Sequence, residues 1–363
     1  MRRILKRVLY SFAILLVLSL AAVLLFGHSN YSKGSGNLQS KLDAFMEKKE
    51  DFSGVVLIAK DGNILMEKGY GMANKEEGLT NQQDTKFRIA SITKTFTATA
   101  IMQLEEKGLL SVQDPLSKFY PDLPNSDSIT LHHLLSHSSG YVEYLSKGFE
   151  FDHEYTKEQL VDLFKDEPLN FTPGKKFSYS NSGFLLLGMV IEKVSGQSFE
   201  DYIAENIFKP AGMTHSSFDV ENPQELATGY VKGEPGPKVD PSIAFAAGDI
   251  ISTAQDVYLY DQALKSNKLL KSETQNKMYT VYSSSFPYQY GYGWYVFETF
   301  GHRNISHSGG YPNGFRNYLT RYIDDDLTII VLSNQMETNS KALTRELASI
   351  VFGKGIWFWQ KSL

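Results

Sequence analysis

A serine and a lysine three residues apart form the first pair that could do chemistry, in Ser91-Ile92-Thr93-Lys94. On a helix this spacing places the hydroxyl and the ammonium on one face, close enough to interact. A serine becomes a nucleophile when a neighbouring base takes its proton, and a lysine can be that base where burial or a nearby cation lowers its pKa. Ser91 also lies at the expected helix start, where free N–H groups favour developing negative charge. On this motif alone, a capping serine beside a solvated lysine stays open as an alternative.

A second candidate, Tyr179-Ser180-Asn181, directly precedes an apolar stretch that continues to Val194. A tyrosine near a cation can lose its proton more readily than its usual pKa of about 10 implies, and could then relay a proton to a leaving group. The amide of Asn181 could donate to a substrate carbonyl. A helix start capped by Ser180 or Asn181 is the structural alternative.

A third candidate is His307-Ser308-Gly309-Gly310, which follows the glycine-rich stretch Tyr290–Trp294. Consecutive small residues on an edge strand let the backbone of a substrate approach closely. A free N–H at Gly310 could pair with that of Ser91 as an oxyanion hole. A glycine turn between strands is the alternative.

Strand-forming stretches lie towards both ends of the chain. Lys60-Asp61-Gly62-Asn63 separates two apolar runs near residues 54–66, and Asp-Gly in such a place predicts a hairpin. Strands return at Phe315–Arg321 and Leu327–Leu332, whereas helical spacing predominates between, at 91–106, 181–194, 198–207 and 253–264. This order predicts an α+β (mixed α/β) fold, in which an antiparallel sheet built from both ends of the chain is flanked by helices and interrupted by a large helical insertion.

The composition narrows the class of protein. The 363 residues are 42% hydrophobic and 21% charged, with a net charge of −5 and no cysteine. A nucleic-acid-binding protein, a disulfide-stapled domain and a cysteine nucleophile are therefore not indicated. Four basic residues among positions 1–7 precede an uncharged, mostly apolar run at 8–26, which is about the length of a membrane span. We expect an uncleaved anchor rather than a signal peptide, because no small-residue cleavage site follows the run.

In their order along the chain, the three motifs resemble those of the serine β-lactamase and penicillin-binding-protein superfamily: Ser-x-x-Lys, then Tyr-x-Asn, then Lys/His-x-Gly. The resemblance extends over about residues 38–353. It includes Phe52–Leu57, which resembles the opening strand of the family, the signature loop Leu134–Gly140, and Ala246–Asp256, which leads into a late helix. The branch is that of class C β-lactamases, D-Ala-D-Ala carboxypeptidases, D-amino amidases and related esterases.

The resemblance implies roles for the motif residues. Ser91 would attack a carbonyl to form an acyl-enzyme, and Lys94 and Tyr179 would share the proton transfers in an order that the sequence leaves open. Asn181, His307, Ser308 and Gly309 would bind substrate, and the N–H groups of Ser91 and Gly310 would hold the oxyanion. The β-lactamases of this branch usually carry Lys where this chain has His307, so efficient β-lactamase activity is not expected.

The resemblance and the expected location together predict a membrane-anchored, penicillin-binding-protein-like serine hydrolase acting on the D-amino-acid peptides of the cell wall, as a D-Ala-D-Ala carboxypeptidase does. An esterase, an amidase or a weak β-lactamase of the same fold is one alternative, and a non-catalytic acyl-binding sensor or wall-interaction module is another. We expect no cofactor and no metal. His133 and His137 have a zinc-like spacing, but Leu134 stands where a metalloprotease carries Glu.

The predicted organisation has five parts. They are a basic cytoplasmic N-terminus at 1–7, a transmembrane signal-anchor helix at 8–26, a flexible linker at 27–37, a β-lactamase-like serine hydrolase domain at 38–353 and a C-terminal tail at 354–363. The expected location is the bacterial cell membrane, crossed once, with the catalytic domain outside the cytoplasm. The expected partners are the membrane and a small-molecule or peptidoglycan-peptide substrate, with no nucleic acid, and we expect a monomer.

Overall fold

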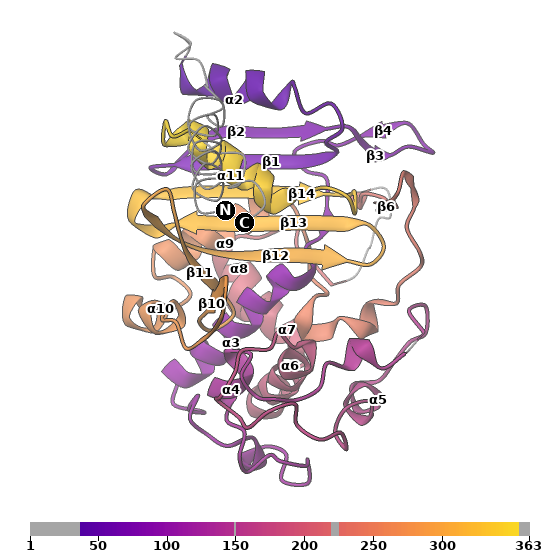
Figure 1. Ribbon diagram of the computed structural model, residues 1–363, viewed down its shortest axis with the longest axis vertical. Helices are drawn as coiled ribbons and strands as arrows, with labels where there is room; N and C mark the ends of the chain where they lie inside the picture. The colour runs from indigo at the N-terminus through magenta and orange to yellow at the C-terminus, as the bar shows by residue number, and fades with distance from the viewer. Residues whose placement is uncertain (1–36, 149, 219–224, 356–363) are drawn as a thin grey trace, which may run out of the picture. The chain divides into compact units, whose positions relative to one another are not determined.

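Two strands from opposite ends of the chain, β1 (Gly54–Lys60) and β14 (Leu327–Ser333), pair antiparallel along their whole length, from Gly54 opposite Ser333 to Lys60 opposite Leu327. Every residue of β14 is buried, as is all of β1 except Lys60, which explains why both read as continuous apolar runs rather than alternating ones. The computed structural model in Figure 1 describes residues 37–148, 150–218 and 225–355.

These strands belong to an eight-stranded antiparallel sheet with the order β2-β1-β14-β13-β12-β11-β10-β9. The other six strands are β2 (Asn63–Tyr70), β9 (Ser283–Ser285), β10 (Tyr288–Tyr290), β11 (Tyr295–Thr299), β12 (His302–Tyr311) and β13 (Phe315–Tyr322). The predicted hairpin joins β1 to β2, and both of its turn residues are left-handed, Asp61 with φ 52° and Gly62 with φ 76°. The prediction of a sheet built from both ends of the chain is confirmed.

Helices occupy the sequence between β2 and β9, as predicted for the insertion, and gather on one side of the sheet in Figure 1. They are α3 (Thr93–Glu106), α4 (Leu131–Leu135), α5 (Lys157–Asp162), α6 (Asn181–Ser195), α7 (Phe199–Ile203), α8 (Lys209–Ala211), α9 (Ala254–Lys265) and α10 (Ser272–Met278). The apolar helix α6 packs against α3, α4 and α7, while α9 packs on β14 and β1. Short two-stranded pairings link the rest: β3 (Met72–Asn74) with β4 (Leu79–Thr80), β5 (Phe87–Arg88) with β8 (Ile251–Ser252), and β6 (Tyr230–Val231) with β7 (Glu234–Pro235).

The chain divides into two compact units, Lys49–Thr344 and a second unit of residues 1–48 with 345–363. The first unit holds all the strands and the helices α3 to α10. In the second, the described elements are α2 (Leu38–Met46), capped by Asn37, and the part of α11 (Ser340–Val351) that follows Thr344. The predicted single domain at 38–353 stays a prediction.

The predicted transmembrane helix requires a correction. Among the helices of the described residues, none has both the length and the hydrophobicity to cross a membrane. The longest of them, α6, has 15 residues, or about 22 Å of helix, against the ~30 Å of a bilayer core. The run at 8–26, which carried that part of the fold prediction, lies outside the described residues, as do residues 1–7, most of the predicted linker and the tail from 356.

Candidate active site

Ser91 lies in a single 3-10 turn, η1 (Ala90–Ile92), that leads directly into α3. The residue before it, Ala90, has φ 52°, a left-handed conformation that is strained for a residue with a side chain. The third motif packs against this turn, because a Cβ added to Gly309 would lie 2.1 Å from the carbonyl oxygen of Ile89. The close approach expected from a substrate backbone is made here by the protein's own chain, and β12 is an interior strand of the sheet rather than the expected edge strand.

Lys94 is fully buried on the first turn of α3, and its Nζ reaches three neutral oxygens. It lies 3.1 Å from Ser91 Oγ, 2.7 Å from Asn181 Oδ1 and 2.7 Å from the carbonyl oxygen of Ala247. Burial lowers the pKa of Lys94 to about 7, although the negative charge of Glu143 raises it. A lysine that loses its proton near neutral pH, within hydrogen-bonding distance of a serine hydroxyl, can act as a general base.

Tyr179 contacts both Lys94 and Ser91 in the same cluster. Its hydroxyl forms a hydrogen bond with Ser91, and Lys94 Nζ lies 5.0 Å from the centre of its ring. Burial raises the pKa of Tyr179 well above its usual value, which outweighs the effect of that hydrogen bond. The expectation that a neighbouring cation would make this tyrosine unusually acidic is wrong for the free protein, in which the phenol keeps its proton.

Asn181 begins α6, directly after Ser180, whose side chain accepts from the N–H of Gly183 as the helix cap. The amide of Asn181 faces inward: Oδ1 accepts from Lys94, and Nδ2 donates to Glu143 Oε1 at 3.2 Å. The backbone N–H of Asn181 also donates to Glu143 Oε2, at 2.5 Å. The amide that we expected to donate to substrate thus connects Lys94 with the carboxylate of Glu143.

His307 is fully buried and makes two hydrogen bonds, from Nε2 with the hydroxyl of Tyr290 at 3.0 Å and from Nδ1 with the carbonyl oxygen of Ser308 at 2.7 Å. Burial, reinforced by the charge of Lys94, lowers the pKa of His307 to about 3. The partial positive charge expected here near neutral pH is therefore absent. Ser308 and Gly310, by contrast, are exposed.

A small cavity of about 80 Å³ opens beside the nucleophile. Ser91, Asn181 and Gly310 line it, so the two predicted oxyanion-hole residues face the same space. The rest of the lining is mostly apolar: Ala90, Tyr144, Leu145, Phe151, Val239, Ile243, Ala244, Ala247, Gly248, Tyr311 and Pro312. Tyr179 and His307 are not part of this lining.

Three features of the site have no role in the motif analysis. Glu143 holds Asn181, the carbonyl of Ala247 accepts from Lys94, and His137 contacts Tyr179. Ala247 and His137 do lie in segments that resemble the family, Ala246–Asp256 and Leu134–Gly140, but those segments assign them no role. The side chain of His133 belongs to the capping box of α4, and no group of three or more His, Cys, Asp or Glu side chains in the described part of the chain is arranged to hold a metal.

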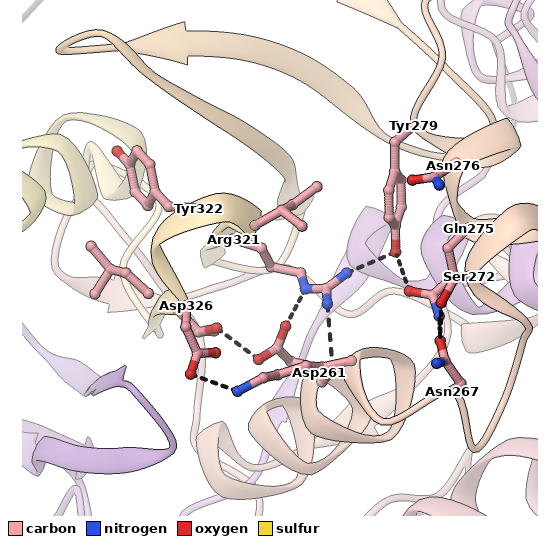
Figure 2. Close-up of a pocket in the computed structure, with 13 residues that line it drawn as sticks. Asp261, Asn267, Ser272, Gln275, Asn276, Tyr279, Arg321, Tyr322 and Asp326 are labelled. Carbon is pink, nitrogen blue, oxygen red and sulfur yellow. Dashed lines mark hydrogen bonds and ion pairs between the residues drawn. The ribbon is translucent and has the colours of Figure 1, made fainter.

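A second buried cation lies elsewhere in the same unit, beside a cavity of about 190 Å³ between α9, α10 and the β13–β14 connection. Figure 2 shows the Arg321 guanidinium between the Asp261 carboxylate and the hydroxyl of Tyr279. Thr328 donates to the other oxygen of Asp261 at 2.7 Å. Arg321, Asp261, Tyr279 and Thr328 are all buried, so the arrangement is part of the core rather than an open site.

Comparisons with known proteins identify the family of this chain. The Beta-lactamase family model matches residues 38–351. A Bacillus subtilis (strain 168) protein provisionally named penicillin-binding protein PbpX is 37% identical over 301 residues, which cover 81% of this chain and 73% of that protein. The teichoic acid D-alanine hydrolase of Staphylococcus aureus is 29% identical over 307 residues, 82% of this chain and 74% of that one.

Among solved structures, the penicillin-binding protein homologue from Pyrococcus abyssi, described as octameric, has a TM-score of 0.79 at 30% identity and covers 87% of this chain and 77% of its own. The expectation of a monomer therefore finds no support in that relative. The family match spans most of the sequence and coincides with the unit that carries Ser91, Lys94 and Tyr179. The chain belongs to the beta-lactamase family, within the superfamily of penicillin-binding-protein-like serine hydrolases.

Proposed function

We propose that this chain hydrolyses D-alanyl or related D-amino-acyl derivatives of bacterial cell-wall polymers through an acyl-enzyme on Ser91. The observation that carries the proposal is the position of Lys94, which is buried among neutral oxygens with Nζ 3.1 Å from Ser91 Oγ. With a pKa of about 7, Lys94 can accept the serine proton near neutral pH. The name of the staphylococcal relative, a teichoic acid D-alanine hydrolase, supports the acyl group and a place of action at the cell wall.

The proposed acylation step uses Ser91 and the residues of its cluster. Ser91 Oγ attacks the acyl carbon while its proton passes to Lys94 Nζ, and the N–H groups of Ser91 and Gly310 hold the oxyanion. The bond to the leaving group breaks, and the leaving oxygen or nitrogen takes a proton through the hydroxyl of Tyr179, which is re-protonated from Lys94. The raised pKa of Tyr179 keeps its hydroxyl protonated, so the relay passes one proton to the leaving group and receives another from Lys94. Water then releases the acyl group by the reverse transfers.

The proposed substrate is an ester or amide of the D-amino acid rather than a peptide that ends in a free carboxylate. A carboxypeptidase substrate carries a negative charge next to the scissile bond, and a cation in the third motif would stabilise it. His307 occupies that place, is buried and is neutral at any pH where the protein would work. Esters and amides of D-alanine do not need such a cation.

A D-Ala-D-Ala carboxypeptidase remains the second candidate function. The penicillin-binding-protein name of the Bacillus relative, at 37% identity, favours it. Ser308 supports it too, since it is exposed next to Gly309 and its hydroxyl could donate to a carboxylate without a cation.

The test uses the full-length protein and its Ser91→Ala variant. Each is incubated with an activated ester and with a fluorescent penicillin, and adducts are located by intact mass and peptide mapping. We expect a transient acyl adduct on Ser91 in the parent protein and none in the variant. Hydrolysis of D-alanyl glycerol ester is then compared with that of a D-Ala-D-Ala peptide. Faster hydrolysis of the ester supports the proposal, faster hydrolysis of the peptide replaces it with the second candidate, and acylation of Ser91→Ala overturns the nucleophile assignment.

A further inference from the structure

One histidine holds both sides of the Tyr179 backbone. His137 follows α4, is fully buried and has φ 53°, a conformation that few residues with a side chain adopt. Its carbonyl oxygen accepts from the N–H of Ser178 at 2.8 Å, and its ring Nδ1 accepts from the N–H of Ser180 at 3.1 Å. The residues on either side of Tyr179 are therefore tied to a single residue of another loop.

The ring of His137 also supports the tyrosine side chain directly. Its centre lies 4.3 Å from that of Tyr179 at an interplanar angle of 39°, and 4.5 Å from that of Tyr290. The rings of Phe177 and Phe184 complete the surroundings, at 5.9 and 5.1 Å. Contact on the ring face and two anchored neighbours leave the Tyr179 side chain little freedom to turn away from Ser91.

The hydrogen bond from Ser180 determines the protonation of the histidine. An acceptor at Nδ1 requires the neutral ring with its proton on Nε2, and that nitrogen is buried without a partner in the described structure. Burial, reinforced by the charge of Lys94, lowers the pKa of His137 well below its usual value. The lone pair on Nδ1 is thus present throughout the neutral range, and a histidine that must stay neutral is poorly suited to proton transfer.

We propose that His137 is a positioning residue for Tyr179, which it holds within reach of Ser91 through the Nδ1 hydrogen bond to the Ser180 N–H and through ring contact. The inference rests on the proposed role of Tyr179 in the acylation of Ser91. It differs from the reading of His137 as an ordinary core residue, because it assigns the effect to one acceptor atom rather than to the volume of the ring.

Three substitutions at this position separate the acceptor from the volume. His137→Asn places an amide oxygen close to where Nδ1 lies, and Asn tolerates a left-handed backbone. His137→Gln carries the same amide one carbon further out, so its oxygen corresponds to Nε2 instead. His137→Leu fills much of the space with no acceptor. Gln and Leu share the same backbone penalty, which makes them matched controls for strain.

We expect kcat for an activated ester to fall about 10²-fold in His137→Leu and His137→Gln, as for a catalytic group displaced by about 1 Å, with KM nearly unchanged. His137→Asn should recover most of kcat. Equal loss in all three variants at equal Tm, or full activity in the Leu variant, would overturn the proposal. If the Leu variant does not fold, the comparison between Asn and Gln decides the question.

A second readout does not depend on turnover. Hydrogen exchange of the peptide containing residues 175–182 should be faster in the Leu and Gln variants than in the parent, and restored in the Asn variant. Unchanged exchange in all three His137 variants would contradict the proposal that His137 positions Tyr179. If this exchange pattern is observed but the parent protein forms no adduct on Ser91, the proposed function is wrong and the positioning role of His137 is retained. If the parent is acylated on Ser91 while His137→Leu and His137→Asn behave alike, the positioning role of His137 is wrong and the proposed function is retained.

Discussion

Lys94 and Arg321 are both buried cations, yet their surroundings differ in kind. Lys94 reaches a hydroxyl, an amide oxygen and a carbonyl, all neutral, and burial lowers its pKa to about 7. Arg321 forms an ion pair with the Asp261 carboxylate and hydrogen-bonds Tyr279, and its pKa is raised even though burial alone would lower it. The same fold thus keeps one buried cation permanently charged and leaves the other close to losing its proton.

The difference shows which buried charge can do chemistry. A cation held by a carboxylate contributes to structure, because its charge is compensated and cannot be given up near neutral pH. A cation buried among neutral acceptors is costly to keep charged, so its proton is available for transfer. The Arg321–Asp261 pair in Figure 2 belongs to the first kind, and Lys94 beside Ser91 belongs to the second.

Replacing Lys94, the cation buried among neutral oxygens, should have the largest effect on activity. We expect Lys94→Met to lower kcat/KM for an activated ester by about 10³-fold, because the general base is lost while the volume of the side chain is kept. Steady-state kinetics of the purified variant measure this. Activity within tenfold of the parent would remove Lys94 from the mechanism.

The same variant has a stability control. In the parent, the pKa of Lys94 is about 7 when folded, against 10.5 for an unperturbed lysine, so the unfolded chain binds more protons between these values. Stability contributed by this group must therefore rise with pH from about 7 to 10.5. Urea unfolding at several pH values should show that slope reduced in Lys94→Met, with no loss of stability at pH 7.

Breaking the paired cation should affect stability instead. We expect Asp261→Asn to lower the free energy of unfolding by about 3–5 kcal/mol, because Arg321 would be left buried without a compensating charge. Urea unfolding measures the loss. The kcat of the folded variant should stay within a factor of two of the parent, since the pair lies outside the Ser91 cluster. A decrease in the free energy of unfolding below about 1 kcal/mol would show that the charge of Arg321 does not depend on the Asp261 carboxylate for compensation.

Replacing both partners sharpens the comparison. Asp261→Leu combined with Arg321→Met removes the two charges together, and we expect it to recover most of the loss seen in Asp261→Asn. Recovery should be incomplete, because the hydroxyls of Tyr279 and Thr328 each lose a hydrogen-bond partner. A double-mutant cycle with Asp261→Leu and Arg321→Met alone gives the coupling free energy between the two side chains. Additive single effects would mean that the pair is not a unit.

The sequence predicts the parts of this comparison that depend on local pattern. The apolar runs of β1 and β14, the Asp61-Gly62 turn and the start of α6 follow from residue type and spacing, and the structure confirms each. The spacing of Ser91 and Lys94 correctly places their side chains together. The Ser91 cluster could be proposed because all three motifs are short and contiguous.

Electrostatic state could not be predicted, because it depends on what the fold packs around a group. A neighbouring lysine suggested an acidic Tyr179, but burial raises its pKa instead. His307 was expected to be partly charged and is neutral. The roles of the Ala247 carbonyl and of Glu143 follow from tertiary contacts that no local pattern encodes.

The smallest expected effect concerns Glu143. Its negative charge raises the pKa of Lys94 through space rather than through a direct hydrogen bond. The acid limb of kcat/KM should have a midpoint near pH 7, since Lys94 must be neutral to accept the serine proton. Glu143 raises the pKa of Lys94, so Glu143→Gln should move the midpoint to lower pH, on the order of half a pH unit or about 0.7 kcal/mol.

The limb cannot belong to either histidine of the cluster, because His137 and His307 both have lowered pKa values and are neutral well below pH 7. Glu167→Gln is the matched control, since Glu167 is a surface carboxylate paired with Lys147 and should leave the midpoint unchanged. A pH–rate profile of the three proteins measures the shift. A midpoint that moves to higher pH in Glu143→Gln would mean that the acid limb reports the titration of a group other than Lys94. The assignment of Lys94 as the buried cation that takes part in chemistry would then lose its support.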